Sequence, residues 1–116
     1  MSIGSFSISN PLNNLESNLL NNLSSQSYWK IVQGELVWDG PPSCSKKEII
    51  DWLIYIQQAI IGYSLLARKD EPEKYWFLNG HYIRGKVEIL INEGKFILEF
   101  DGPGNHLYLD GKKIYP

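Results

Sequence analysis

One segment, Lys46–Lys69, constrains the fold of this chain most strongly, because it is the longest stretch with helical periodicity. Ser45 and Glu48 fit a capping box, in which the hydroxyl accepts from a first-turn amide and the carboxylate reaches back to the cap amide. Asp51 lies early in the segment and Arg68 late, which suits the dipole of a helix. The sequence therefore predicts one long central helix, KKEIIDWLIYIQQAIIGYSLLARK.

The apolar side chains of this central helix fall on two stripes when they are projected at 3.6 residues per turn. A helix that lies on one face of a sheet needs a single apolar stripe, so two stripes predict a helix that is covered from two directions. The wide stripe holds Ile49, Trp52, Leu53, Ile56, Ala59, Ile60 and Tyr63, and the narrow stripe holds Ile50, Ile54, Ile61 and Leu65.

A membrane-spanning helix is the alternative, because Ile49–Ala67 is long enough to cross a bilayer. Asp51, Gln57 and Gln58 would then lie in or near hydrocarbon, at a cost in free energy. The amphipathic segments elsewhere in the chain also need an apolar core to cover. We therefore predict that the helix is a core element and that the protein has no membrane partner.

Two elements are predicted before the central helix. Residues 1–9 read as a disordered tail or a short edge strand. Asn10 as N-cap and Pro11 at the first helical position predict a shorter N-terminal helix that reaches Leu23. Its leucine stripe is expected to cover the narrow stripe of the central helix, or else to meet another chain. Tyr28–Asp39 then predicts a strand or a hairpin, with Gly34 as a turn or a bulge.

Hairpin turns punctuate the chain after the central helix. Asn79-Gly80, Glu93-Gly94 and Asp110-Gly111 each separate stretches of alternating apolar residues. They predict an antiparallel meander of about four to six strands that ends in an edge strand. The predicted fold class is a single α+β domain over residues 1–116, in which the long helix and the N-terminal helix pack on the meander or are embraced by it.

Charge and cysteine content exclude some classes of function. The net charge is −2 and there is no basic tract, so nucleic-acid binding lacks its electrostatic footprint. The single cysteine, Cys44, excludes an intramolecular disulfide. Together with the absence of a signal-peptide pattern, this predicts a reducing, cytoplasmic location.

Few residues are candidates for catalysis or metal binding. Cys44 precedes a helix N-terminus with lysines nearby, an arrangement that can lower a thiol pKa, but the neutral alternative is a small loop residue. His81 and His106 each open a strand, and no spacing matches a metal site. We therefore predict no catalytic residue, no metal and no cofactor, lean against an enzyme, and leave the roles of these three side chains open.

Aromatic residues are the least ordinary feature, with four Trp and seven Tyr. They are enriched at protein interfaces and line ligand pockets. Adjacent strand residues face opposite sides, so one member of Tyr28-Trp29 and one of Tyr75-Trp76 must face away from the core. The pairs therefore indicate a partner, a pocket or a covering helix on the second face.

The leading hypothesis is a non-enzymatic protein-interaction, adaptor or regulatory module that binds a protein partner, itself or another, and forms a homo-oligomer. Polar substitution of Ile54 and Ile61 would then give soluble monomers. The interaction surface would comprise Ile50, Ile54, Ile61, Leu65, Trp38 and Trp76.

The alternative hypothesis is a small-molecule-binding protein, or a weakly marked enzyme, with a pocket between the central helix and the curved sheet. Such a protein would carry a bound ligand, whereas a fully packed core would exclude it. The pocket would comprise Trp52, Tyr63 and Phe100, with polar contacts from His81, Arg84 and Asp101 at its mouth.

Overall fold

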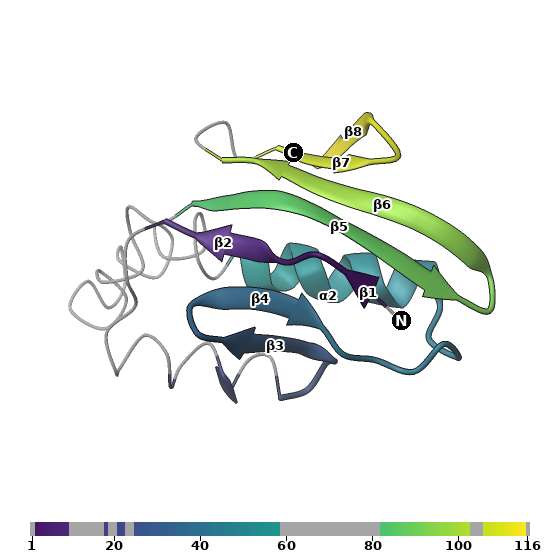
Figure 1. The fold of residues 1–116 in the computed structure, drawn as a ribbon, viewed down its shortest axis with the longest axis horizontal. Helices are drawn as coiled ribbons and strands as arrows, with labels where there is room; N and C mark the ends of the chain where they lie inside the picture. The colour runs from purple at the N-terminus through teal and green to yellow at the C-terminus, as the bar shows by residue number, and fades with distance from the viewer. Residues whose placement is uncertain are drawn as a thin grey trace.

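The computed structural model describes residues 2–9, 18, 21–22, 25–58, 82–102 and 106–115. In this part of the chain eight strands form one antiparallel sheet, and helix α2 lies against one face of it (Figure 1). Across the sheet the strands lie in the order β3-β4-β2-β5-β6-β7-β8, and β1 also pairs with β5. The elements are β1 (Ser2–Ile3), β2 (Phe6–Ile8), β3 (Trp29–Val32), β4 (Glu35–Trp38), α2 (Lys46–Gln57), β5 (Ile83–Ile91), β6 (Gly94–Asp101), β7 (Leu107–Leu109) and β8 (Lys112–Tyr115).

This architecture corrects the predicted fold class. The sequence predicts two helices around which a meander is arranged, whereas the described residues are mostly β and the sheet is the main element. Within the described residues, helix α2 spans the twelve residues Lys46–Gln57. It covers one face of the sheet rather than serving as the element around which the sheet is arranged (Figure 1). The remainder of the predicted central helix, and nearly all of the predicted N-terminal helix, lie outside the described residues.

Contacts with the sheet and with its own cap hold α2 at both ends. The hydroxyl of Ser45 accepts from the amide of Glu48 at 3.1 Å, which confirms the predicted N-cap. The carboxylate of Glu93, in the turn between β5 and β6, accepts from the amide of Lys46 at 2.7 Å. At the other end, the side-chain amide of Gln58 donates to the hydroxyl of Tyr115 on β8 at 2.6 Å. The helix is therefore fixed across the sheet rather than attached at one point.

Helix α2 is amphipathic. Its inner side buries Ile49, Leu53 and Ile56 completely, as the wide stripe predicts. Its outer side carries charged residues and Tyr55, whose side chain is exposed. Within the described ranges, no helix is long and apolar enough to cross a membrane.

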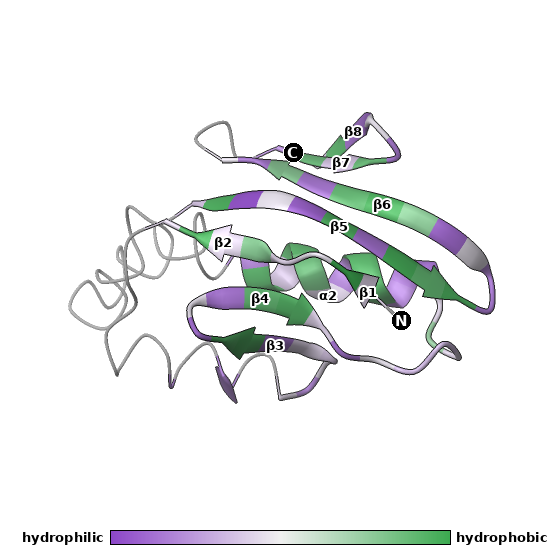
Figure 2. Ribbon diagram, viewed as in Figure 1, coloured by the Kyte–Doolittle hydropathy of each residue, from purple (hydrophilic) through white to green (hydrophobic). Residues whose placement is uncertain are grey.

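The core lies between α2 and the inner face of the sheet. Side chains alternate along the strands, so that Val87, Ile89 and Ile91 of β5 are buried while Leu90 is exposed. Hydrophilic and hydrophobic residues alternate over the earlier part of β5 (Figure 2). In the pairing of β5 with β6, Val87 lies opposite Leu98, and both side chains are buried on the inner face of the sheet. Aromatic rings fill the middle of this layer. The largest buried side chains are Trp29, Phe6, Phe100, Leu36, Ile49, Leu53, Ile56, Ile83 and Ile89.

The N-terminal segment contains a central strand, β2, where a tail or an edge strand is predicted, whereas β1 pairs with β5 alone among the described strands. β2 lies between β4 and β5 and pairs with both, with Phe6 opposite Leu36 on one side and Gly85 on the other. Phe6 is fully buried and its ring contacts Phe100 at 4.9 Å. Of the three apolar residues in this segment, Phe6 lies in the core, Ile8 packs against it, and Ile3 is 66% exposed.

The hairpin turns follow the sequence closely. Gln33 and Gly34 connect β3 to β4 with φ of 52° and 78°, so Gly34 is part of a turn rather than a bulge. Asp110-Gly111 connects β7 to β8 with φ of 50° and 85°, and the predicted last hairpin is confirmed. β8, with its two lysines, is the edge strand at one side of the sheet. The predicted turn at Asn79-Gly80 lies outside the described residues.

Candidate functional site

The outer side of α2 presents two aromatic rings one turn apart. Trp52 is partly buried and packs against the core, whereas Tyr55 is 47% exposed. Their ring centroids are 5.7 Å apart and the planes meet at 82°, an edge-to-face contact. The i, i+3 spacing of a helix places these two side chains side by side. They form a rigid aromatic surface on a regular element.

A cavity of about 380 Å³ opens over this surface. Among the described residues it is lined by Gln26, Asp51, Trp52 and Tyr55. Gln26 comes from the segment that leads into β3, so two parts of the chain contribute to the wall. We call these four residues the Trp52 cavity. Its chemistry is aromatic, with one carboxylate and one amide on its wall.

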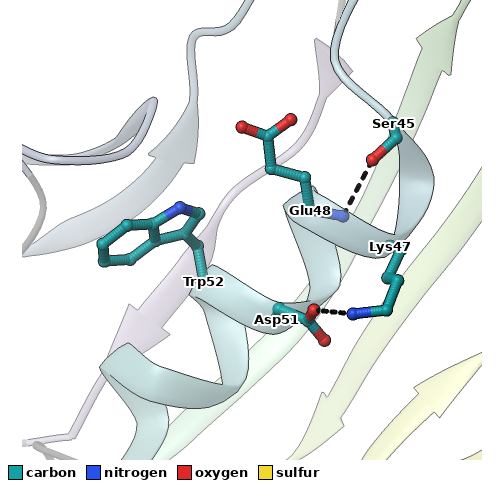
Figure 3. A pocket seen from close by; sticks show the side chains of 5 residues that line it. All are labelled: Ser45, Lys47, Glu48, Asp51 and Trp52. Carbon is teal, nitrogen blue, oxygen red and sulfur yellow. Dashed lines mark hydrogen bonds and ion pairs between the residues drawn. The ribbon is translucent and has the colours of Figure 1, made fainter.

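A second, smaller cavity of about 250 Å³ adjoins it toward the N-terminus of α2 (Figure 3). It shares Asp51 and Trp52 with the first, and its other lining residues are polar. Lys47 donates to Asp51 at 2.6 Å, and this hydrogen bond, with the charge of Asp51, raises the pKa of Lys47. Both side chains are largely in water. The remaining residues of this cavity are Ser45 and Glu48.

The structure divides the residues of the predicted interaction surface. Ile50 and Ile54 are partly buried and pack against the core, so the narrow stripe is only partly accessible at these two positions. Trp38 is 4% exposed and contacts Trp29 with centroids 5.3 Å apart. Ile61, Leu65 and Trp76 lie outside the described residues. Tyr28 is exposed while Trp29 is buried, as strand alternation predicts for that pair.

The residues of the predicted pocket between helix and sheet are also separated. Phe100 is a core side chain on the inner face, whereas Arg84 and Asp101 are opposite each other in the register of β5 and β6 and alternate with the buried positions. Trp52 instead lines the two cavities on the outer side of α2. Tyr63 and His81 lie outside the described residues.

Asp101 and His106 meet at the turn between β6 and β7. The carboxylate of Asp101 accepts from the backbone amide of His106 at 3.0 Å and from the hydroxyl of Tyr108 at 3.5 Å. These contacts close the turn, which is a structural role for an aspartate. Across the described ranges, no group of three His, Cys, Asp or Glu side chains is placed to hold a metal ion.

Cys44 is a core residue. Its side chain is 8% exposed and belongs to the apolar cluster beneath α2. Burial, and secondly the negative charge of Glu48, raise the pKa of the Cys44 thiol. A raised pKa is the opposite of what a reactive thiolate requires, so the reactive-thiolate interpretation receives no support.

Because Cys44 is buried, we expect a thiol reagent such as 5,5′-dithiobis(2-nitrobenzoate) to modify it only at the rate at which the protein unfolds locally or globally. The stability of the protein is also expected to fall as the pH rises above the ordinary thiol pKa of about 8.5, because the unfolded thiol ionises while the native thiol keeps its proton. Urea unfolding between pH 7 and 9.5 measures this effect, and Cys44→Ala serves as control. Equal pH dependence in both proteins, or immediate modification, would contradict the assignment.

Sequence reasoning missed the composition of the Trp52 cavity. The sequence places Trp52 on the wide stripe and in a pocket between helix and sheet, and it does not single out Gln26, Asp51 or Tyr55 as site residues. A signal was present, because Asp51, Trp52 and Tyr55 lie within one helical turn of one another. The approach of Gln26 depends on tertiary structure and has no local signal.

Searches with the chain against protein-family models, curated proteins and solved structures return no match. The function must therefore be inferred from the geometry of the Trp52 cavity and its surroundings.

Proposed function

We propose that this chain is a non-enzymatic binding module that recognises a second protein chain through the Trp52 cavity. The observation that carries the proposal is Tyr55, a large aromatic side chain held 47% exposed beside Trp52 on a helix that is fixed at both ends. Tyrosine and tryptophan are enriched among the residues that contribute most to protein interfaces. A rigid aromatic pair also loses little conformational entropy on binding.

The packing of aromatic side chains between α2 and the sheet favours this function over a ligand pocket in the same place. Phe6, Phe100 and Trp29 fill the described part of that layer with ring contacts of 4.9 and 5.8 Å. The two cavities at Trp52 lie on the opposite, outer side of α2. A second protein chain has access to this side without any change in the core.

Photo-crosslinking from position 55 tests the proposal. Tyr55 is replaced by benzoylphenylalanine, a photoreactive aromatic residue of similar shape, and the protein is irradiated in its own cells. We expect a covalent product of higher mass, and mass spectrometry then distinguishes a second copy from a foreign protein. Tyr55→Ala is expected to weaken the complex about tenfold or more, since exposed aromatic anchors contribute about 2 kcal/mol.

Val32 provides a matched control position. It is 51% exposed, at the end of β3 and outside the Trp52 cavity. Benzoylphenylalanine at position 32 is expected to give no product, or a different one. The same products from positions 55 and 32, or none from position 55, would rule out the cavity as the binding surface.

A further inference from the structure

We infer that the Trp52 cavity takes a cationic side chain, lysine or arginine, of the partner protein. This inference rests on the proposed function and adds the chemistry of recognition to it. Three features of the described residues support it. They are the arrangement of the Trp52 and Tyr55 rings, the presence of Asp51 in the cavity lining, and the weak surface ion pair between Lys47 and Asp51.

The two rings suit a cation. Trp52 and Tyr55 meet nearly at right angles, at 82°, in an edge-to-face contact rather than a flat stack, so their faces point in different directions. The face of an aromatic ring carries negative electrostatic potential, and indole attracts cations most strongly. Perpendicular rings can present such surfaces to one ligand, as in the aromatic cages that bind ammonium groups. An anion would be repelled from the same faces.

Asp51 adds a negative charge beside the rings. It lines the same cavity and its side chain is 57% exposed, so an incoming ligand can reach it, although its carboxylate is turned toward Lys47 (Figure 3). Its ion pair with Lys47 is made through Oδ2. A carboxylate has several acceptor positions on its two oxygens, so one donor does not saturate it. Gln26, on the same wall, carries an amide oxygen that can also accept from a cationic donor.

Lys47 competes for Asp51 only weakly. Its side chain is 85% exposed, and a pair of this kind at the surface contributes little to stability. The order is also the less favourable one, because the lysine precedes the acidic residue along the helix. A ligand cation that also contacts the rings can therefore replace or share this pair at small cost.

The cavity has room for one side chain of a partner, since its volume of about 380 Å³ is near the lower end of the range for sites that hold whole small ligands, roughly 300–1,000 Å³. The chain also has a net charge of −2, which favours the approach of a basic partner.

The test uses n-butylammonium chloride, which reproduces the lysine side chain, against n-butanol, its neutral analogue. The full chain is labelled with ¹⁵N and titrated at constant ionic strength, and the indole N–H signal of Trp52 is followed, after assignment with Trp52→Phe. We expect a saturable shift with butylammonium and none of the same size with butanol. Equal responses to the two probes would overturn the inference, since the site would then be merely apolar.

Two substitutions with opposite expected effects sharpen the test. Asp51→Asn should weaken butylammonium binding about threefold or more, because the carboxylate charge is lost. Lys47→Gln should strengthen it about twofold, because the internal competitor is removed. Asp39→Asn, an exposed carboxylate outside the cavity, changes the net charge equally and should leave binding unchanged. Indistinguishable behaviour of Asp51→Asn and Asp39→Asn would also overturn the inference.

The outcomes separate this inference from the proposed function. A cross-link from position 55 whose yield is insensitive to Asp51→Asn, together with no preference for butylammonium, would retain the binding module and reject the cationic ligand. Selective butylammonium binding without any cross-linked protein would retain the cation site and reject a protein partner.

Discussion

Replacement of Trp29 by alanine is expected to lower the free energy of unfolding by about 3–5 kcal/mol, the range for removing a large aromatic side chain from a core. Trp29 is fully buried, and its ring lies 5.8 Å from Phe6 and 5.3 Å from Trp38. Its indole N–H donates to the carbonyl of Ile49 at 3.1 Å, which joins β3 to the first turn of α2. The substitution thus opens a cavity and removes a buried link between sheet and helix. Urea unfolding followed by circular dichroism measures the change.

Trp29→Phe and Val32→Ala are the controls for this prediction. Phenylalanine keeps a ring in the layer but loses the donor, so an intermediate loss is expected and the protein remains foldable. Val32 lies on the same strand and is 51% exposed, so its substitution should change stability by less than about 0.5 kcal/mol. A loss for Trp29→Ala as small as that of Val32→Ala would show that Trp29 does not hold the core together.

Gly85→Ala is expected to destabilise the protein by about 2–4 kcal/mol, through backbone strain and a steric conflict together. Gly85 has φ of 139°, a conformation that residues with a side chain rarely adopt. A Cβ atom there would stand 2.7 Å from the carbonyl oxygen of Ser5, which is backbone and cannot rotate away. Either β2 or β5 must move, and the pair of Phe6 with Gly85 is lost. The midpoint of urea unfolding measures the effect.

Gly94 is a matched control, because its φ of 130° is similar and nothing lies within 4 Å of the Cβ position. Gly94→Ala therefore reports the strain alone, about 1–3 kcal/mol. The difference between the two variants isolates the close approach of β2 to β5. If both alanine variants lose the same stability, the approach of the two backbones is looser than described.

Short-range features were predictable from the sequence because their determinants are local. Asp110-Gly111 specifies its turn through two residues that accept positive φ, and Ser45 specifies the start of α2 through a hydroxyl three residues from its donor. Alternation along β5 and β6 follows from the period of a strand. These features needed no knowledge of the rest of the chain.

Long-range features were not predictable in the same way. Nothing near Phe6 indicates that its partners are Leu36 and Gly85, so the N-terminal segment was interpreted as a tail or an edge strand. Periodicity predicts Trp52 on the wide stripe, with a place in a pocket between helix and sheet, because apolar periodicity does not tell a partly buried ring from a fully buried one. The Trp52 cavity depends on Gln26, which reaches α2 only through the placement of β3.

The central position of β2 requires that distant parts of the chain pair before the sheet is complete. Ser7 and Arg84, which face each other across β2 and β5, are 77 residues apart in the chain. A contact between such distant residues requires loop closure before it contributes any stability, so a sheet of this topology is expected to fold slowly. On the ribosome, β2 emerges early but waits for most of the chain before its second partner exists. Until then β2, paired with β4 alone, exposes an unpaired edge, the kind of surface through which nascent chains associate with one another and which chaperones protect.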